Sequence, residues 1–279
     1  MEQFRSGWKK SYYGKGDVIA YRLRRNGGPS PVFGANVKIL LYGEAFWPTY
    51  TTGDNTNLIA TDSMKNFVQR ETLNFTGDDL EAYCSFLGEK FLAKYPQTEG
   101  LQISATEIPY KAIGEGGVGF EPAGGETAFA TLELQRDGEP VFSSGLKGYK
   151  LLRLRGSRFQ GFVRDEYTTL PDLKDRPLLM SLDLEWTYTN AMAAMSDGKT
   201  TTAVRTLVHD VFCKFESGSI QQVIYKLGNA MLEDLPAIAE IQLEANNRTW
   251  DTVVERHDLI GSYTDARPPY GCLGLRLKR

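Results

Sequence analysis

The chain has 279 residues, a length that suits one large domain or two of about 140 residues each. Hydrophobic residues make up 41% of the sequence, enough for a sizeable core, and the net charge of −3 argues against a basic field that would attract nucleic acid or an acidic membrane. The three cysteines are widely separated, and no run of about 18 apolar residues occurs. We therefore expect no disulfide framework, no metal site and no membrane span, and we expect a cytoplasmic protein.

The first half of the chain is predicted to fold as two strands, two helices and two further strands. Alternating apolar residues indicate strands, and apolar residues three or four positions apart indicate helices. The predicted strands cover residues 18–24, 32–42, 101–108 and 127–134, the first helix begins near Thr61, and the second contains residues 80–91. A turn rich in glycine, residues 25–29, separates the first two strands.

The same order recurs in the second half. Strands are predicted over residues 147–154, 178–188, 239–244 and 272–277, and helices over residues 204–215 and 220–235, with Pro236 ending the second helix. Little residue identity links the halves, so the repeat is one of architecture. Antiparallel strands around paired helices predict an α+β fold. The turn at residues 136–140 predicts a boundary, with one unit over residues 1–138 and a second over residues 139–279.

Two features that often mark enzymes have weaker interpretations here. The glycine-rich residues 114–125 lack the GxxxxGK[ST] spacing of a phosphate-binding loop, so we expect a flexible loop. The only two histidines, His209 and His257, lie off the apolar stripe of a helix and in a charged run, which predicts surface positions. The sequence offers no support for a Ser-His-Asp hydrolase or a two-histidine metal site.

Three polar segments are candidates for a functional site. Residues 50–66 contain a polar run that ends in Thr61-Asp62-Ser63. These residues can cap the following helix, and a helix N-terminus also offers free N–H groups to an anion. Residues 159–176 are too polar for a core element and too patterned for an ordinary loop. The third candidate combines the helix start at residues 219–222 with residues 245–250, which follow a strand.

These segments resemble the signatures of the cofactor-free urate oxidase family. Residues 53–66 match the pattern G-D-N-x-x-x-x-A-T-D-S-x-K-N, and residues 159–170 match F-x-G-F-x-R-D-E-Y-T-T-L, with an Asp-Arg pair at 175–176. Tyr13-Gly14-Lys15 matches as well, and the matches occur in the expected order. The resemblance implies tandem tunnelling-fold (T-fold) units, with antiparallel sheets and paired helices, that assemble into a barrel-like homotetramer whose active sites are shared between subunits.

The resemblance also implies a role for each matched residue. Phe159 corresponds to the aromatic ring that stacks on the purine, and Arg176 to the guanidinium that grips it. The other substrate-binding candidates are Gln221 at the opposite edge, Ile220 through its backbone N–H, Asn247 at the oxygen position above the ring, and Asp62. The candidate catalytic residues are Lys15 and Thr61, which move protons and in the family come from the neighbouring subunit, and Thr249.

The chemistry of O2 gives a reason for this set. Triplet O2 reacts with a closed-shell molecule only when that molecule is an easily oxidised anion. A planar arginine fork stabilises such an anion, a phenylalanine ring supports it, and lysine and threonine can carry protons where burial lowers the lysine pKa. The resemblance therefore implies a small heterocyclic substrate and O2 as partners, and no cofactor, neither metal nor flavin.

One position departs from the family pattern. The family's Asn-Lys-His stretch reads Asn247-Arg248-Thr249 here, so Thr249 stands where a histidine completes the proton relay. The family's H-x-H-[SA]-F stretch is also replaced, by residues 125–129. A hydroxyl passes on a hydrogen bond but does not act as a base near pH 7. Losing a positioned acid–base group typically costs about 10²–10⁴-fold in rate.

Three functional hypotheses follow. The first, favoured by the departure at Thr249, is a cofactor-free oxidase that uses O2 on a purine-like N-heteroaromatic anion related to uric acid, with an altered substrate. The second is a true urate oxidase, which converts urate and O2 to 5-hydroxyisourate and H2O2 through a different proton relay. The third is a non-catalytic purine-binding homologue. Retention of Lys15 and Thr61 argues against the third, because an inactive protein need not keep its proton-handling pair.

Overall fold

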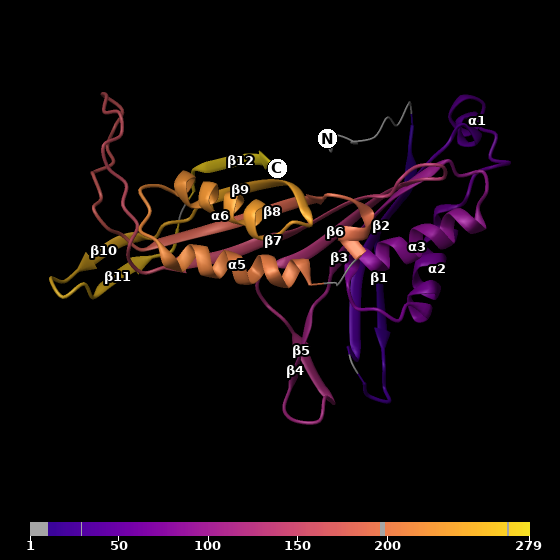
Figure 1. The fold of residues 1–279 in the computed structure, drawn as a ribbon, viewed down its shortest axis with the longest axis horizontal. Helices are drawn as coiled ribbons and strands as arrows, with labels where there is room; N and C mark the ends of the chain where they lie inside the picture. The colour runs from indigo at the N-terminus through magenta and orange to yellow at the C-terminus, as the bar shows by residue number, and fades with distance from the viewer. Residues whose placement is uncertain (1–10, 29, 196–198, 267) are drawn as a thin grey trace. The chain divides into compact units, whose positions relative to one another are not determined.

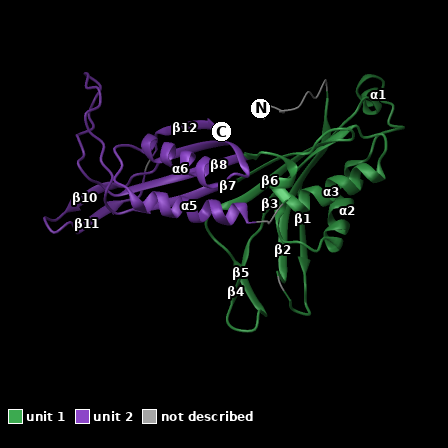
Figure 2. Ribbon diagram, in the orientation of Figure 1, with its two compact units in different colours: residues 1–145, 187–198 green, residues 146–186, 199–279 purple. Residues whose placement is uncertain are grey.

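The computed structural model of the protein describes residues 11–28, 30–195, 199–266 and 268–279. It divides into two compact units, one of residues 1–145 and 187–198 and one of residues 146–186 and 199–279 (Figure 2). The division therefore falls within two strands, β7 (Val141–Arg153) and β8 (Leu178–Tyr188). A boundary between two tunnelling-fold units at residue 138 stays a prediction.

The first unit is a sheet covered by two helices (Figure 1). Its strands β1 (Tyr13–Leu23), β2 (Val32–Tyr42), β3 (Gly100–Glu107) and β6 (Thr127–Gln135) pair antiparallel in the order β1-β2-β3-β6. Helix α2 (Thr61–Glu71) packs on β1, and α3 (Leu80–Lys94) packs on β3 and β6. Alternate residues of β2, among them Val37 and Ile39, are fully buried, as are Cys84 and Leu87 of α3. The apolar residues at strand spacing in β2 and at helix spacing in α3 are therefore buried in one core.

The second unit repeats this order of elements. Its strands β7, β8, β9 (Ile238–Asn247) and β12 (Cys272–Lys278) follow one another in the sheet, and β9 pairs antiparallel with β12. Helix α6 (Ile220–Asp234) packs on both of these strands and on α5 (Thr200–Lys214). The predicted α+β class and the recurrence of strand, strand, helix, helix, strand, strand are confirmed.

Two arginines show the repeat in atomic detail. Each immediately follows the last strand of its half and donates hydrogen bonds to carbonyl oxygens at the end of the second helix and just beyond it. Arg136 donates to Leu92, Tyr95 and Thr98, and Arg279 donates to Leu232, Leu235 and Ile238. Counted from the last helical residue, Lys94 or Asp234, the acceptors lie at −2, +1 and +4 in both halves. Both guanidinium groups thus satisfy carbonyls that a helix end leaves free.

Several short elements were not predicted from the sequence. They are the 3₁₀ helices Glu44–Phe46 and Thr72–Asn74, helices α1 (Trp47–Thr51) and α4 (Ala191–Met195), and strands β4 (Tyr110–Ile113), β5 (Gly119–Pro122), β10 (Asp251–Glu255) and β11 (Gly261–Thr264). The expectation of a flexible loop at residues 114–125 was wrong, because β5 lies inside it and pairs with β4. Gly114, Gly116 and Gly117 have positive φ and form the turn of this hairpin.

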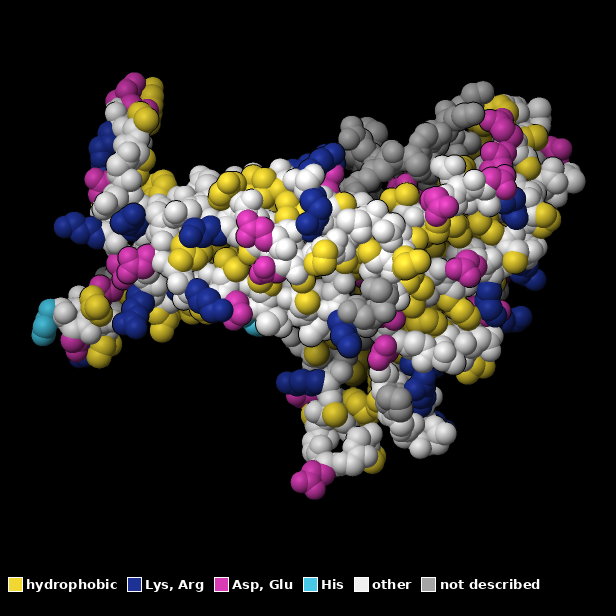
Figure 3. Space-filling view, in the orientation of Figure 1, with side chains coloured by type: hydrophobic (Ala, Val, Ile, Leu, Met, Phe, Trp, Pro, Cys, Tyr) yellow, Lys and Arg dark blue, Asp and Glu magenta, His cyan; other side chains and the backbone are white. Residues whose placement is uncertain are grey.

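The surface agrees with the mixed charge of the sequence. On the face shown in Figure 3, basic and acidic side chains alternate in small groups. In the described ranges, no helix combines the length and the apolar character needed to cross a membrane. Both histidines are exposed as predicted, although His209 Nε2 lies 2.6 Å from the hydroxyl of Tyr149.

A buried carboxyl group lies between α3 and the sheet of the first unit. Glu81 is only 6% exposed, and its Oε1 accepts hydrogen bonds from Ser144 Oγ at 2.6 Å and from the Tyr188 hydroxyl at 2.5 Å. Burial raises the pKa of Glu81, and the two hydroxyl groups oppose that shift only in part. Because the carboxyl holds its proton more tightly in the folded state, its contribution to stability is full below the unfolded pKa and is lost as pH rises through the folded pKa.

We therefore expect Glu81→Gln to flatten the pH dependence of stability above pH 4.5, the ordinary glutamate pKa. Glutamine keeps the accepting Oε1 and carries no charge, so the variant should gain stability relative to the parent as pH rises. Urea unfolding at a series of pH values measures this difference. The control is Glu71→Gln, since a hydrogen bond from Lys90 lowers the pKa of Glu71 and its contribution has the opposite sign. Parallel pH profiles for parent and Glu81→Gln would contradict the expectation.

Candidate functional site

The first part of the candidate site lies in the first unit, at the start of β1. Lys15 is half-buried and stands next to a bulge in the pairing of β1 with β2, between Lys15 and Val18. Its neighbour Gly14 lies against the β2 backbone, where a side-chain Cβ would come within 1.9 Å of the Ile39 carbonyl oxygen. Only glycine allows this approach, which explains the glycine in the Tyr13-Gly14-Lys15 motif.

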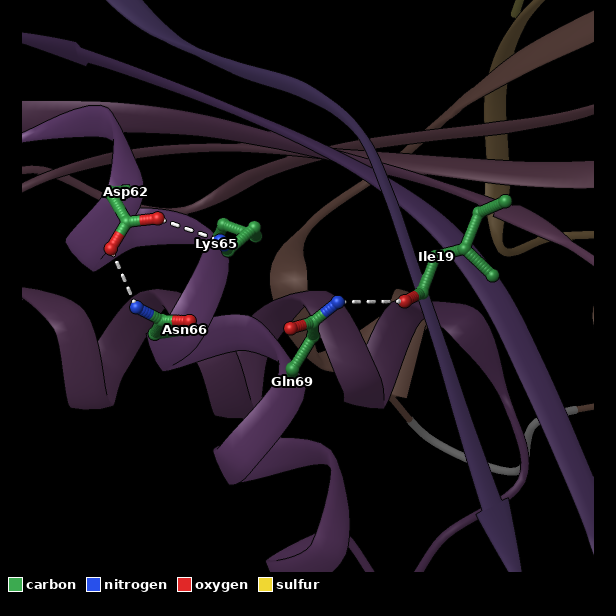
Figure 4. A network of polar contacts seen from close by, with 5 residues as sticks. All are labelled: Ile19, Asp62, Lys65, Asn66 and Gln69. Carbon is green, nitrogen blue, oxygen red and sulfur yellow. Dashed lines mark hydrogen bonds and ion pairs between the residues drawn. The ribbon is translucent and has the colours of Figure 1, made fainter.

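The start of α2 brings Thr61 to this strand. The hydroxyl of Tyr13 accepts a hydrogen bond from the backbone N–H of Ile59 at 3.0 Å, which ties β1 to the segment before α2. Burial raises the pKa of Tyr13 to about 12, so this hydroxyl stays neutral at physiological pH. Further along, Gln69 Nε2 donates to the carbonyl oxygen of Ile19 at 3.4 Å (Figure 4). Strand and helix are thus held together at two levels.

The predicted capping of α2 by residues 61–63 was wrong. Ala60 occupies the N-cap position without a side-chain bond, and Thr61 is the first helical residue. The Asp62 carboxylate instead accepts from Lys65 Nζ at 2.6 Å and from Asn66 Nδ2 at 2.8 Å (Figure 4). The start of α2 therefore has no side-chain cap, and the Thr61 hydroxyl makes no capping bond.

The charge of Asp62 is set by lysines. The hydrogen bond from Lys65 and its charge lower the pKa of Asp62, with a smaller contribution from Lys15 on β1. This coupling shows that Lys15 and the start of α2 lie close enough to interact. An ionised carboxylate repels an anion, so the group of Asp62 suited to face one is its backbone N–H in the first turn of α2. Its role in substrate binding stays a prediction.

The second part of the site lies in the second unit, where one extended segment meets two others. The N–H of Arg158 donates to the Ser217 carbonyl oxygen at 2.9 Å, two residues before the α6 N-cap. Phe159 and Leu173 exchange backbone hydrogen bonds of 2.8 and 2.9 Å, and this pair closes the loop of residues 159–173. Phe159, Arg176 and the segment before α6 thereby lie close together, while their roles in binding stay a prediction.

Arg176 presents an unsatisfied donor beside an aromatic ring. Its Cζ lies 5.7 Å from the centre of the Phe159 ring, and its buried Nε finds no hydrogen-bond partner in the described residues. Asp175 does not supply one; its Oδ1 accepts the backbone N–H groups of Gly156, Ser157 and Arg176 itself. Burial lowers the pKa of Arg176. A buried donor without a partner is costly, so this guanidinium is suited to an anionic acceptor.

The Phe159 ring is supported by a residue that sequence reasoning did not select. Phe162 stacks on Phe159 with ring centres 4.9 Å apart and planes 14° from parallel. Arg164 in turn lies 4.9 Å over the Phe162 ring. The F-x-G-F spacing was the available signal, since Gly161, with a positive φ, turns the chain so that the second phenylalanine returns to the first.

The start of α6 offers backbone donors. The Ser219 hydroxyl caps the helix by accepting the Gln222 N–H at 3.2 Å, and Gln222 Oε1 accepts the Gly218 N–H at 2.7 Å. These two bonds leave the first-turn N–H groups of Ile220 and Gln221 outside the cap. The Gln221 side chain is exposed and Ile220 is buried, so Gln221 can offer its amide and Ile220 only its backbone.

Asn247 ends β9 and is held by its neighbours. Its N–H donates to the Gly271 carbonyl oxygen at 2.9 Å, and the next N–H, of Arg248, donates to the Leu179 carbonyl oxygen at 3.0 Å. Its side-chain Oδ1 accepts from the N–H of Thr249 at 3.1 Å and from the Thr249 hydroxyl at 2.6 Å. Thr249 therefore acts directly on the Asn247 carboxamide.

The described residues contain no cluster of three or more His, Cys, Asp or Glu side chains placed to hold a metal ion. The three cysteines are free thiols, with Cys84 buried in α3. In the second unit, the unpartnered donor of Arg176 and the first-turn N–H groups of α6 are suited to a planar anion.

Comparison with known proteins identifies relatives along nearly the whole chain. A uricase family model matches residues 142–271. A uricase of Haloferax volcanii is 36% identical over 92% of this chain and 93% of its own length. A uric acid degradation bifunctional protein of a Bacillus species is also 36% identical over 93% of this chain, which spans 58% of that longer protein. The crystal structure of a uricase from Bacillus fastidious, 34% identical, has a TM-score of 0.89 and covers 97% of this chain and 94% of its own.

Identity at this level over more than nine-tenths of the chain extends the similarity from sequence motifs to the complete fold. The tunnelling fold, which the motifs implied, is shared with the solved uricases. The chain belongs to the uricase family.

Proposed function

We propose that this protein is a true urate oxidase, which oxidises the urate anion with O2 without a cofactor. The reaction balances as urate, O2 and water giving 5-hydroxyisourate and H2O2: two electrons pass from the purine to O2, and the oxygen of water forms a bond to C5. The single observation that carries the proposal is Arg176, whose buried Nε has no partner in the described residues and whose guanidinium lies beside the Phe159 ring.

The residues of the second unit are proposed to bind the purine. Phe159 supports one face of the ring, and Arg176 donates a planar pair of hydrogen bonds to its anionic edge. Gln221 reads the opposite edge with its exposed amide, and Ile220 offers its N–H at the start of α6. Asn247 holds O2 above the ring. Holding both reactants in one place replaces a bimolecular encounter by a reaction within a complex.

The residues of the first unit are proposed to move protons. Removing a proton from urate makes it easier to oxidise. The peroxide that forms from O2 needs two protons to leave as H2O2. Lys15 on β1 supplies an amino group, and Thr61 at the start of α2 supplies a hydroxyl, with Asp62 beside it. The resemblance assigns them to the neighbouring subunit of a homotetramer with a barrel-like arrangement. We propose the same assembly, and a cytoplasmic location, for this protein.

An altered substrate is the weaker alternative. It rested on Thr249 in place of a histidine, but relatives named uricase match this chain over 92% of its length at 36% identity. The hydroxyl of Thr249 also keeps a defined partner in Asn247. The non-catalytic alternative leaves the retained Lys15 and Thr61 without a purpose.

The test is oxygen consumption by the purified protein with urate, together with loss of urate absorbance and release of peroxide. We expect one H2O2 for each urate and each O2, unchanged after exhaustive dialysis against a chelator, because no step needs a metal. Binding of urate without O2 consumption would overturn the oxidase and support the purine-binding alternative. Loss of activity on chelation, restored by a metal, would overturn the cofactor-free reaction.

A further inference from the structure

We infer that Thr249 is a positioning residue that fixes the orientation of the Asn247 carboxamide, and that it does not act as a proton relay. The inference rests on the proposed function, since it concerns the oxygen side of the same site. Its basis is the pair of bonds at Asn247 Oδ1, from the Thr249 N–H at 3.1 Å and from the Thr249 hydroxyl at 2.6 Å.

These two bonds determine which way the carboxamide faces. A backbone N–H can only donate, so the atom that it meets must be the amide oxygen and not the NH2 group. The Thr249 hydroxyl then donates to the same oxygen at 2.6 Å and reinforces this orientation. Rotating the carboxamide by 180° would place its NH2 group against the Thr249 N–H and lose that bond, and the Thr249 hydroxyl would have to turn and accept from the NH2 group.

The orientation leaves the Nδ2 hydrogens of Asn247 directed away from Thr249. No acceptor for Nδ2 occurs in the described residues, although Asn247 itself is half-buried. Two N–H donors at this place suit an oxygen molecule that gains negative charge as electrons arrive, because their bonds strengthen as superoxide or peroxide forms. The reversed amide would present an oxygen lone pair to the same charge and repel it.

The same geometry disfavours a relay through position 249. A threonine hydroxyl has one proton, and here that proton is directed at Asn247 Oδ1. A carboxamide oxygen is a poor proton acceptor near neutral pH, so the chain of hydrogen bonds from Thr249 ends there. Thr249 therefore keeps the Asn247 donors in place, and the proton transfers are left to Lys15 and Thr61.

The test compares Thr249→Val, Thr249→Ser and Thr249→His in the full-length protein. Valine keeps the shape and the backbone N–H but loses the bond from the hydroxyl to Asn247. We therefore expect kcat/KM for O2 to fall about tenfold, the factor that corresponds to the loss of one hydrogen bond. Affinity for xanthine, a purine anion that lacks the 8-oxo group, should stay unchanged because Asn247 faces the oxygen side. Serine should restore the parent value, and the valine pH–rate profile should keep the shape of the parent profile. Thr252→Val, exposed on β10, is the matched control.

The outcomes separate the inference from the proposed function. If the parent protein does not oxidise urate, the function fails whatever the variants do. If the parent oxidises urate and Thr249→Val keeps its kcat/KM for O2, the positioning role is overturned. If Thr249→His exceeds the parent rate and adds a titration near pH 6–7, position 249 serves proton transfer and the inference is overturned. A crystal structure of Thr249→Val with a rotated Asn247 carboxamide would support it.

Discussion

Replacing Arg176 by alanine is expected to weaken binding of urate or xanthine by about 10²–10³-fold, because two charge-assisted hydrogen bonds are lost together. Arg176 Nε is already buried without a partner in the described residues, so this atom gives up no bound water when the ligand arrives. Arg176→Lys should recover only part of the affinity, since an ammonium keeps the charge but lacks the planar fork. Isothermal titration with xanthine measures the loss without turnover.

The control for Arg176 is a different guanidinium of the same unit. Arg256 forms a two-bond contact with Asp258 in the exposed turn of the β10–β11 hairpin. Arg256→Ala should leave purine affinity unchanged, because exposed ion pairs contribute little. Equal affinity of Arg176→Ala and the parent protein would contradict the binding site, and with it the observation that carries the proposed function.

The long elements could be predicted from the sequence because each buries a continuous apolar pattern. Residues 32–42 and 178–188 were predicted to the residue, since each is a strand whose alternate side chains are buried. Short elements such as α1 and β10 escaped prediction. The five residues of β10 are all exposed, so no apolar periodicity marks them, and their pairing with β11 depends on the turn between them.

The candidate site residues were selected by resemblance, but the contacts that they make could not be predicted. Composition alone does not show that Thr249 binds Asn247, or that Phe162 stacks on Phe159, since both pairs depend on backbone turns between them. The predicted capping role of Thr61 failed for a related reason. A cap is defined by backbone geometry, and the bond from Ile59 to Tyr13, a distant residue in the sequence, helps to place the chain ahead of α2.

Mixed oligomers test whether the two parts of the site come from different subunits, and we expect a large change in activity. Lys15→Met should lower the rate by about 10²–10⁴-fold as a lost acid–base group, and Arg176→Ala should fail to bind substrate. Each variant is therefore expected to be nearly inactive alone. When the two are refolded together, a shared site takes its Lys15 from one chain and its Arg176 from another, so about a quarter of the sites become complete.

A site formed within one chain would recover no activity in this mixture, because every chain carries one defect. The matched control is the double variant Lys15→Met with Arg176→Ala, refolded with an equal amount of parent protein. Shared sites again give about a quarter of the parent activity, whereas sites within one chain give about a half. Random mixing is checked by mass spectrometry of the assembled oligomers. If both mixtures give about a quarter of the parent activity, Lys15 and Thr61 act on substrate bound by a neighbouring chain. If the mixture of single variants gives none and the control gives about a half, they act on substrate bound by their own chain.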